Sequence, residues 1–404
     1  MVISDWYYGS TFQLAHRVNN PNNPYIPGFP GSPPPSNNVL FNGKNRSPTG
    51  STGTYNRMTV TAGSKHLLRL INASVQTAFT VTLVGHSFQI VATDMVPIQP
   101  VTVTNLFLGV GQRYDVIITA NQPVGHYWFN VTFPNAACGS SNNPRPAAIF
   151  SYSGATPANG NPTSAGTVPP DSRCADSLAY SPVVTRTAPG ASTFTPPAGS
   201  TLTAALQINN ALARVFWPVN NSPMKVVWGN PTLKHVQAGT APGSLPASAN
   251  VVSVPTGNTL VYFLVQNNSS IPHPIHLHGH DLLLLGASPA LANPISPANR
   301  LRAYNPSTDA ATLKVNNPTR RDTTMLPAWG WIAVAFRTNN PGAWLFHCHV
   351  AWHASQGFSV QFLEQLSAIP GTVSPGLADI TPNCNAWNAW YPANAPFLQD
   401  DSGI

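Results

Sequence analysis

"WLFHCHVAWHASQGF", residues 344–358, places three histidines and one cysteine within the seven positions from His347 to His353. The whole chain of 404 residues has 12 histidines and four cysteines, so this density is unusual. Side chains of a β-strand alternate between its two faces. We therefore predict a strand in which His347 and His349 point to one face and Cys348 points to the other.

A second histidine-rich stretch, "HPIHLHGH" at residues 273–280, complements the first. On a strand, His276 and His278 share one face, whereas His273, three residues before His276, tends toward the opposite face. Bringing the two stretches together predicts one site that contains His273 and Cys348. It also predicts a second site with four imidazoles, those of His276, His278, His347 and His349.

The first of these sites has the composition of a blue-copper centre. Two imidazoles and one thiolate form its trigonal ligand set when His353, five residues after Cys348, joins them. Zinc accepts the same residue types but requires a fourth ligand or water. We expect the axial position near Phe358, which cannot coordinate, so the site favours Cu(I) and has a raised reduction potential. The peptide that links Cys348 to both neighbouring histidines gives electrons a short covalent route between the two sites.

The composition indicates a globular chain of short strands. Hydrophobic residues make up 42% of the sequence and charged residues 8%, with 42 prolines and 29 glycines as turn formers. The net charge of +7 is spread thinly, and its densest point is "RR" at 320–321. A nucleic-acid surface normally shows clustered basic residues, so that function is discounted. No apolar run reaches the length of a membrane span.

The chain contains a weak internal repeat. "PVGHYWFNVTF" (123–133) resembles "PGAWLFHCHV" (341–350), and "TAFTVTLVGHSFQIV" (77–91) resembles "IPHPIHLHGHDLLLL" (271–285). In this register the positions of the six ligand residues on the two strands are taken in the first copy by Phe79, Thr82, Val84, Asn130, Val131 and Thr132. His280 matches His86 of that copy and is interpreted as structural. Two copies of one β-domain are predicted, the first without metal ligands.

We predict an all-β fold with two Greek-key β-sandwich or barrel domains. Residues 1–155 form the ligand-free domain, 156–200 a Pro/Gly/Ser-rich linker, 201–370 the copper-binding domain and 371–404 a C-terminal tail. Cys138 and Cys174 flank a Pro/Ser/Gly-rich stretch and are candidates for a disulfide across it. Cys384 is then left without a partner.

Four stretches resemble a known family. "HPIHLHGHDLLLLG" (273–286) and "WLFHCHVAWHASQGFSVQFLE" (344–364) resemble the C-terminal copper motifs of multicopper oxidases. "RRDTTMLPAWGW" (320–331) and the terminal "DSGI" (401–404) are similar to laccases of filamentous (ascomycete) fungi. The resemblance implies cupredoxin domains and a secreted, extracellular, monomeric glycoprotein of the kind used in lignin degradation. It also implies oxidation of phenols and aromatic amines by dioxygen, which is reduced to water, with no nucleic-acid or membrane partner.

The resemblance also implies roles for single residues. Type 1 copper would be held by His273, Cys348 and His353, with Phe358 as the non-bonding axial neighbour. Type 2 copper would take His276, and the type 3 pair would take His278, His347 and His349. His353 would be the entry point for electrons, which Cys348 passes on. The substrate pocket would be lined by Gln76, Trp217, Ile271 and Trp352.

This sequence departs from the family pattern in two ways. A complete trinuclear centre of the family uses eight histidines and an enzyme holds four coppers, whereas this chain offers four such histidines and residues 1–270 contain no His-x-His. We therefore expect the family's first cupredoxin domain to be lacking. In addition, Gln76 stands where the family usually has a carboxylate that takes the phenolic proton.

Two alternatives to a laccase remain open. A non-catalytic protein with type 1 copper would need only His273, Cys348 and His353. A ferroxidase or bilirubin-type oxidase would share the copper motifs, but ferroxidases need acidic residues near the type 1 histidines. The sequence has none close to His273 or His353.

Overall fold

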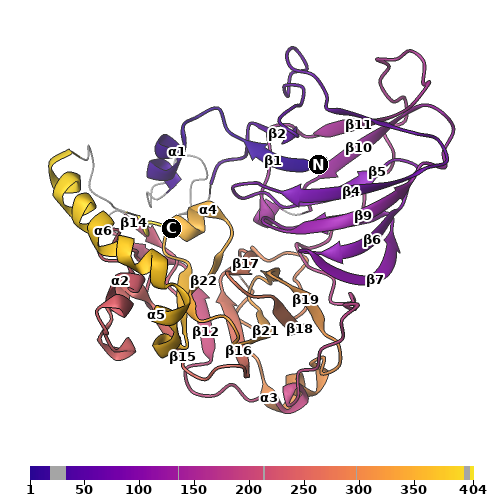
Figure 1. The fold of residues 1–404 in the computed structure, drawn as a ribbon. Helices are drawn as coiled ribbons and strands as arrows, with labels where there is room; N and C mark the ends of the chain where they lie inside the picture. The colour runs from indigo at the N-terminus through magenta and orange to yellow at the C-terminus, as the bar shows by residue number, and fades with distance from the viewer. Residues whose placement is uncertain (19–32, 135, 213, 297, 395–400) are drawn as a thin grey trace.

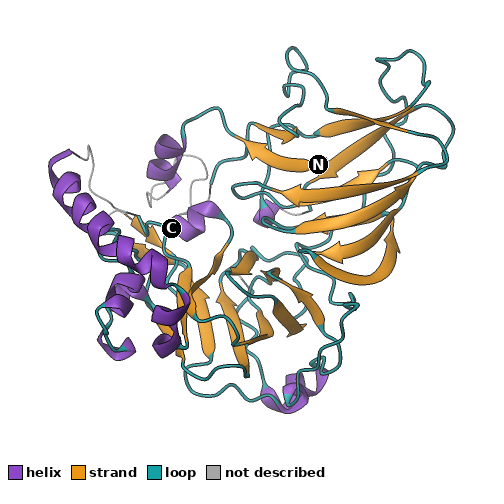
Figure 2. Cartoon of the chain, in the orientation of Figure 1, coloured by secondary structure: helices purple, strands orange, loops and turns teal. Residues whose placement is uncertain are grey.

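β-Strands build both domains (Figures 1 and 2), and several strands of the first domain alternate buried with half-buried residues. The computed structural model describes residues 1–18, 33–134, 136–212, 214–296, 298–394 and 401–404. Strand β9 (Arg113–Thr119) is typical, because Tyr114, Val116 and Ile118 are buried and the residues between them are not. This period of two places one face of a sheet on the core. The expectation of an all-β fold is confirmed.

The first domain is a sandwich of two sheets around one apolar core. Its six-stranded sheet has, in order, β2 (Asn38–Phe41), β1 (Val2–Trp6), β4 (Lys65–Asn72), β9, β6 (Phe88–Thr93) and β7 (Val96–Val103). Its five-stranded sheet has β3 (Arg57–Val60), β11 (Ala147–Tyr152), β10 (His126–Thr132), β5 (Phe79–Leu83) and β8 (Asn105–Leu108). Phe41, Phe79 and Phe129 are fully buried in this core, and burial of such a ring contributes about 1.5–3 kcal/mol.

The second domain repeats this arrangement except for β2, which has no counterpart in it. One sheet has, in order, β12 (Thr201–Ala205), β16 (Leu260–Asn268), β21 (Trp331–Arg337), β18 (Leu282–Ala287) and β19 (Thr319–Arg321). The other has β15 (Val251–Val254), β23 (Ser359–Glu364), β22 (Gly342–Cys348), β17 (His273–Leu277) and β20 (Thr323–Leu326). A small hairpin of β13 (Gln207–Asn209) and β14 (Arg214–Phe216) is added. The pairs β1–β4 and β12–β16 are both parallel, as are β3–β11 and β15–β23.

The pairing register confirms the internal repeat. In the first domain β5 pairs with β10 through Thr82 and Asn130. In the second domain β17 pairs with β22 through His276 and His347, the residues that the sequence alignment places at the same positions. The flanking pairs follow the same register. The two domains therefore share one backbone plan and differ in the side chains that it carries.

His280 and its repeat partner His86 make equivalent contacts. His86 Nε2 lies 2.7 Å from Oη of Tyr152, the last residue of β11. His280 Nε2 lies 2.8 Å from the buried carboxylate of Glu364, the last residue of the equivalent strand β23. Both histidines thus tie a turn to a strand end, which fits the structural role expected for His280.

Helices lie mainly on one flank of the second domain (Figure 1). They are α1 (Thr11–Val18), α2 (Thr232–Gln237), α3 (Pro306–Asp309), α4 (Ala351–Ser355), α5 (Ile369–Thr372) and α6 (Ser374–Asn394). The segment expected as a tail, 371–404, thus contains a helix, α6, that contacts α2 and α5. Prolines at 382 and 392 disfavour helix and conceal α6 in the sequence. Among the described residues, no helix is long and apolar enough to cross a membrane.

The segment expected as a linker, 156–200, is packed against both domains. Cys138 and Cys174 form a disulfide bond that ties it to the first domain, while Cys384 is unpaired and buried. Tyr180 is buried in the core of the first domain. Phe194 is buried in an apolar cluster together with residues of β16, β18 and β21. The segment therefore joins the two domains along its length.

A buried ion pair also joins the two domains. Arg321 Nε of β19 lies 3.0 Å from Oδ2 of Asp94, and both side chains are fully buried. Arg321 Nη1 donates to Tyr114 Oη at 3.1 Å and lies 3.5 Å from Asp176 of the connecting segment. Burial alone would lower the pKa of Arg321, but the interactions with Asp94 and its neighbours raise it well above the usual value. Arg321 therefore stays charged and needs its partners.

We predict that Asp94→Asn lowers the free energy of unfolding by about 3–5 kcal/mol, because it leaves the Arg321 charge buried without compensation. The control is Asp115→Asn, whose partner Arg69 is 71% exposed, and it should cost at most about 1 kcal/mol. Urea denaturation followed by tryptophan fluorescence measures both. Equal losses in the two variants would mean that the Arg321 contact does not hold the domains together.

Candidate metal centre

The predicted alternation of side chains is present in strand β22. Cys348 lies opposite Ile275 and is completely buried in the core of the second domain. Its neighbour His347 lies opposite His276, and both are only half-buried on the outer side of the sheet. The two strands therefore present potential ligands on both faces of one sheet.

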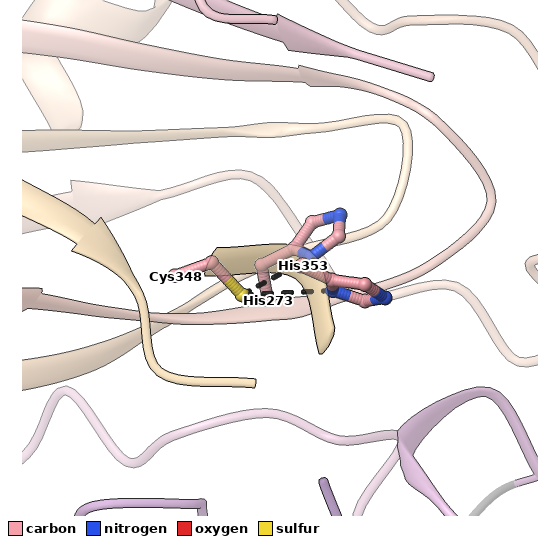
Figure 3. Close-up of side chains that lie close together, drawn as sticks. All are labelled: His273, Cys348 and His353. Carbon is pink, nitrogen blue, oxygen red and sulfur yellow. Dashed lines mark hydrogen bonds between the residues drawn. The ribbon is translucent and has the colours of Figure 1, made fainter. Parts of the chain in front are cut away.

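The inner set consists of His273, Cys348 and His353, whose side chains converge (Figure 3). The two Nδ1 atoms lie 3.1 Å apart, and each lies 3.6 Å from the Cys348 sulfur. His273 and Cys348 come from β17 and β22, while His353 comes from the short helix α4 that follows β22. His353 is 2% exposed and the other two are 0% exposed.

The inner set fits a transition-metal ion. A point equidistant from its three atoms lies about 2.0 Å from each, given sides of 3.1, 3.6 and 3.6 Å, which is a metal–ligand bond length. Burial lowers the pKa of His353 to about 3 and that of His273 well below its usual value, so both imidazoles are neutral. Burial raises the pKa of the Cys348 thiol, so its thiolate needs a cation nearby.

Two aromatic rings close the inner set on one side. The Phe358 ring lies 4.7 Å from the His273 ring. Trp217 stacks on Phe358 at 5.8 Å and contacts both imidazole rings, at 4.7 and 4.8 Å. Since Trp217 is 1% exposed, it packs behind the inner set.

The outer set consists of four imidazoles, those of His276, His278, His347 and His349. His278 Nε2 and His347 Nε2 lie 3.1 Å apart. The Nδ1 atoms of His276 and His347 lie 2.9 Å from the carbonyl oxygens of Asp322 and Cys348, respectively. These bonds place the proton on Nδ1 and leave Nε2 as the ligand atom. Burial lowers the pKa values of His278, His347 and His349, so they too are neutral.

The first domain touches the outer set although it has no ligands of its own. Gly111, between β8 and β9, lies so close to His349 that a Cβ atom there would be 2.5 Å from its ring. Arg113 donates to both oxygens of Asp322, at 2.6 and 2.5 Å. Asp322 in turn holds His276 through its carbonyl. We did not predict Gly111, Arg113 or Asp322 from the sequence, because no local pattern reveals a contact between domains.

A cavity of about 240 Å³ lies beside the inner set, and His353 forms part of its wall. Gln76 and Ile271, both expected at a substrate pocket, line this cavity. Trp217 and Trp352, expected there as well, are 1% and 3% exposed and are not part of the wall. Packing explains the difference, since Trp217 stacks on Phe358 and Trp352 contacts the ring of Tyr7 at 6.1 Å.

Models of the multicopper oxidase family match residues 1–155 and residues 218–367. Together with the relatives below, these matches show that the chain belongs to the multicopper oxidase family. The cupredoxin-like sandwich of both domains is the fold of this family.

Within the family, the chain is similar to fungal laccases. It is 45% identical to a laccase of Neurospora crassa and 44% identical to Laccase-1 of Melanocarpus albomyces, covering 100% of this chain and 62% of either relative. The crystal structure of a laccase from Botrytis aclada superposes with a TM-score of 0.84 at 30% identity, covering 100% of this chain and 70% of that one. The chain thus spans about 62% of the length of the curated relatives that it matches first.

Gly111→Ala is predicted to destabilise the protein by about 1–3 kcal/mol more than Gly63→Ala, because its new methyl group overlaps the His349 ring. Gly63 is the matched control, since it has a similar φ of +76° and open space around its Cα, against +81° for Gly111. Both variants carry the backbone strain of a left-handed alanine. Urea unfolding of the metal-free protein measures the difference, and equal losses would show that His349 does not pack on Gly111.

Proposed function

We propose that this chain is the electron-accepting part of a laccase-type multicopper oxidase, which takes single electrons from small aromatic molecules and delivers them to dioxygen. The observation that carries the proposal is the pair β17–β22 with the residues that follow each strand, which has a Cys/His set on its buried side and four imidazoles on its outer side. One set suits an electron-transfer metal, and the other suits a metal cluster.

In this proposal the inner set binds type 1 copper through His273, Cys348 and His353. Copper supplies one-electron redox chemistry there. The aromatic wall of Phe358 and Trp217 excludes water and offers no axial ligand, which favours the reduced ion. The backbone of β22 then connects Cys348 directly to His347 and His349 of the outer set.

The outer set would bind type 2 copper through His276 and the type 3 pair through His278, His347 and His349. These are four of the eight imidazoles that the family pattern requires. Dioxygen reduction to water needs four electrons, so the cluster must be complete before it works. We therefore propose that the remaining histidines come from a further cupredoxin domain outside these 404 residues.

The substrate is proposed to be a phenol or an aromatic amine bound in the cavity beside His353. Apolar side chains such as Ile271, Ile295 and Met325 line it, which suits an aromatic ring. No carboxylate lines it in the described part of the chain, which argues against Fe(II) as substrate and hence against a ferroxidase.

We further propose that the protein is secreted and glycosylated. Six Asn-x-Ser/Thr sequons are present. Among them, Asn220 and Asn268 are exposed and accessible to a glycan, whereas Asn72 and Asn267 are buried with hydrogen-bonded side chains.

Replacing Phe358 with Met is predicted to lower the reduction potential of type 1 copper, because a thioether sulfur would become a weak axial ligand and stabilise Cu(II). The control is Phe362→Met, a buried change whose ring contacts are Phe263, Phe336 and Phe346 and not the inner set. A redox titration of the blue colour compares the three proteins. An unchanged or higher potential in Phe358→Met would remove Phe358 from the axial position.

The 404-residue protein is predicted to bind type 1 copper and turn blue, yet to consume little or no oxygen with a phenol. Adding a domain that carries two His-x-His motifs should restore oxygen uptake. Elemental analysis of copper and an oxygen electrode provide the measurement. Four coppers per chain with rapid oxygen uptake would disprove the argument about missing ligands. A blue protein that stays inactive even with the added domain would instead support a non-catalytic copper protein.

A further inference from the structure

We propose that the cavity beside His353 discriminates by substrate chemistry and oxidises aromatic amines in preference to phenols. This inference rests on the proposed function, since it concerns the donor that delivers the electron. The inference rests on two observations. The polar atoms that line the cavity are uncharged, and a phenol must release a proton when it gives up an electron, whereas an aromatic amine need not.

Two polar residues of the cavity wall have buried atoms without a hydrogen-bond partner among the described residues. The two atoms are Oε1 of Gln76 and Nε2 of His353. Gln76 is 6% exposed and His353 is 2% exposed. The Gln76 amide is oriented by its nitrogen, which donates to the carbonyl of Pro34 at 3.0 Å. A buried polar atom left unpaired costs about 1–3 kcal/mol, so a ligand that pairs with both atoms is favoured.

The two atoms have opposite hydrogen-bonding roles. Oε1 of Gln76 is an acceptor. Nδ1 of His353 lies 3.6 Å from the Cys348 sulfur, and a metal ion held by this nitrogen would leave the ring proton on Nε2, which is then a donor. An aromatic amine fits this pair, because its N–H donates to Gln76 and its nitrogen accepts from His353. A phenol fits it equally well, so binding alone does not discriminate.

The wall around Gln76 is rigid. The carbonyl of Val75 accepts from the backbone N–H of Ala351 at 2.9 Å, which fixes this loop against the helix that carries His353. The carboxylate of Asp5 accepts from the backbone N–H groups of Val75, Gln76 and Thr77 at 2.8, 3.1 and 3.1 Å. It also accepts from the Thr77 hydroxyl at 2.9 Å.

Burial raises the pKa of the Asp5 carboxyl, so it is the position of Asp5, and not a weak basicity, that keeps it from taking a proton in the cavity. The residue is 5% exposed and is not part of the cavity wall. Among the described residues, no Asp or Glu lines the cavity. A proton released in the cavity therefore finds an amide oxygen, which is not basic, or must reach water.

Phenols and aromatic amines differ in whether they release that proton. When a phenol loses one electron its O–H bond breaks, giving a phenoxyl radical, an electron and a proton that needs an acceptor. When an aromatic amine loses one electron it gives a radical cation that keeps its N–H bonds, and a proton leaves later in water. In both reactions the electron goes to the oxidised copper site of the proposed function. A cavity without a base thus slows the oxidation of the phenol and leaves the oxidation of the amine unaffected.

Reduction of the blue site by 4-methoxyphenol and by 4-methoxyaniline tests the inference, because the two donors share a ring and a substituent. Anaerobic stopped-flow bleaching of the copper-loaded 404-residue protein follows one electron and needs no oxygen chemistry. For the phenol, the rate constant should rise with pH as the phenolate fraction rises. For the amine, it should be constant at every pH where the amino group is unprotonated.

Gln76→Glu supplies the missing base. At mildly acidic pH this substitution should raise the rate constant for reduction of the blue site by the phenol about 10²-fold or more. The rate constant with the amine should change only a few-fold. Gln99→Glu, the same substitution at an exposed position of β7, is the matched control and should change neither. The same pH dependence for both donors in the wild-type protein, or equal acceleration of both by Gln76→Glu, would overturn the inference and leave the copper assignment intact.

Binding to the copper-free protein provides a second measurement that needs no electron transfer. Quenching of tryptophan fluorescence by 4-methoxyaniline reports occupancy, since Trp217 lies 4.8 Å from the His353 ring. Gln76→Ala should weaken binding about fivefold, the value of one net hydrogen bond. If the protein does not turn blue when copper is added, the proposed function fails. An unchanged affinity in Gln76→Ala would overturn the role of Gln76 in any case.

Discussion

The antiparallel pairing of β17 with β22 is the constraint on which both metal-binding sets depend. Its register places His276 opposite His347 and Ile275 opposite Cys348. Because side chains alternate, a shift of one residue would move Cys348 out of the core and His347 into it. The equivalent pair in the first domain keeps the same register with Thr82 and Asn130. The backbone plan therefore does not require metal ligands, which are an addition to it.

The ligand-free domain has its own part in the site. Gly111 packs against the ring of His349, and Arg113 holds Asp322, whose carbonyl orients His276. The buried Arg321–Asp94 pair between the domains adjoins these groups, because Arg321 precedes Asp322 and Asp94 accepts from the backbone N–H of Arg113 at 2.9 Å. Stability and site geometry are therefore expected to be coupled, since the same domain contact carries the ion pair and the neighbours of His349 and Asp322.

The sequence was sufficient for the features that depend on local periodicity. The alternation in "HCH" and "HPIHLH" predicted which side chains share a face, and the weak repeat predicted two copies of one β-domain. It was insufficient where long-range packing decides. Trp217 was expected in the cavity wall but stacks on Phe358, and the terminal segment was expected as a tail but contains α6, whose prolines hide it. The contact of Arg113 with Asp322 joins residues of different domains, which no sequence window contains.

The account depends most on the claim that His273, Cys348 and His353 hold one copper ion. Anomalous diffraction at the copper absorption edge, from crystals of the copper-loaded protein, tests it directly. The account predicts an anomalous peak about 2.0–2.3 Å from Nδ1 of His273, Nδ1 of His353 and the Cys348 sulfur. A copper-loaded crystal with no peak between these three atoms, and with its metal elsewhere, would contradict the account.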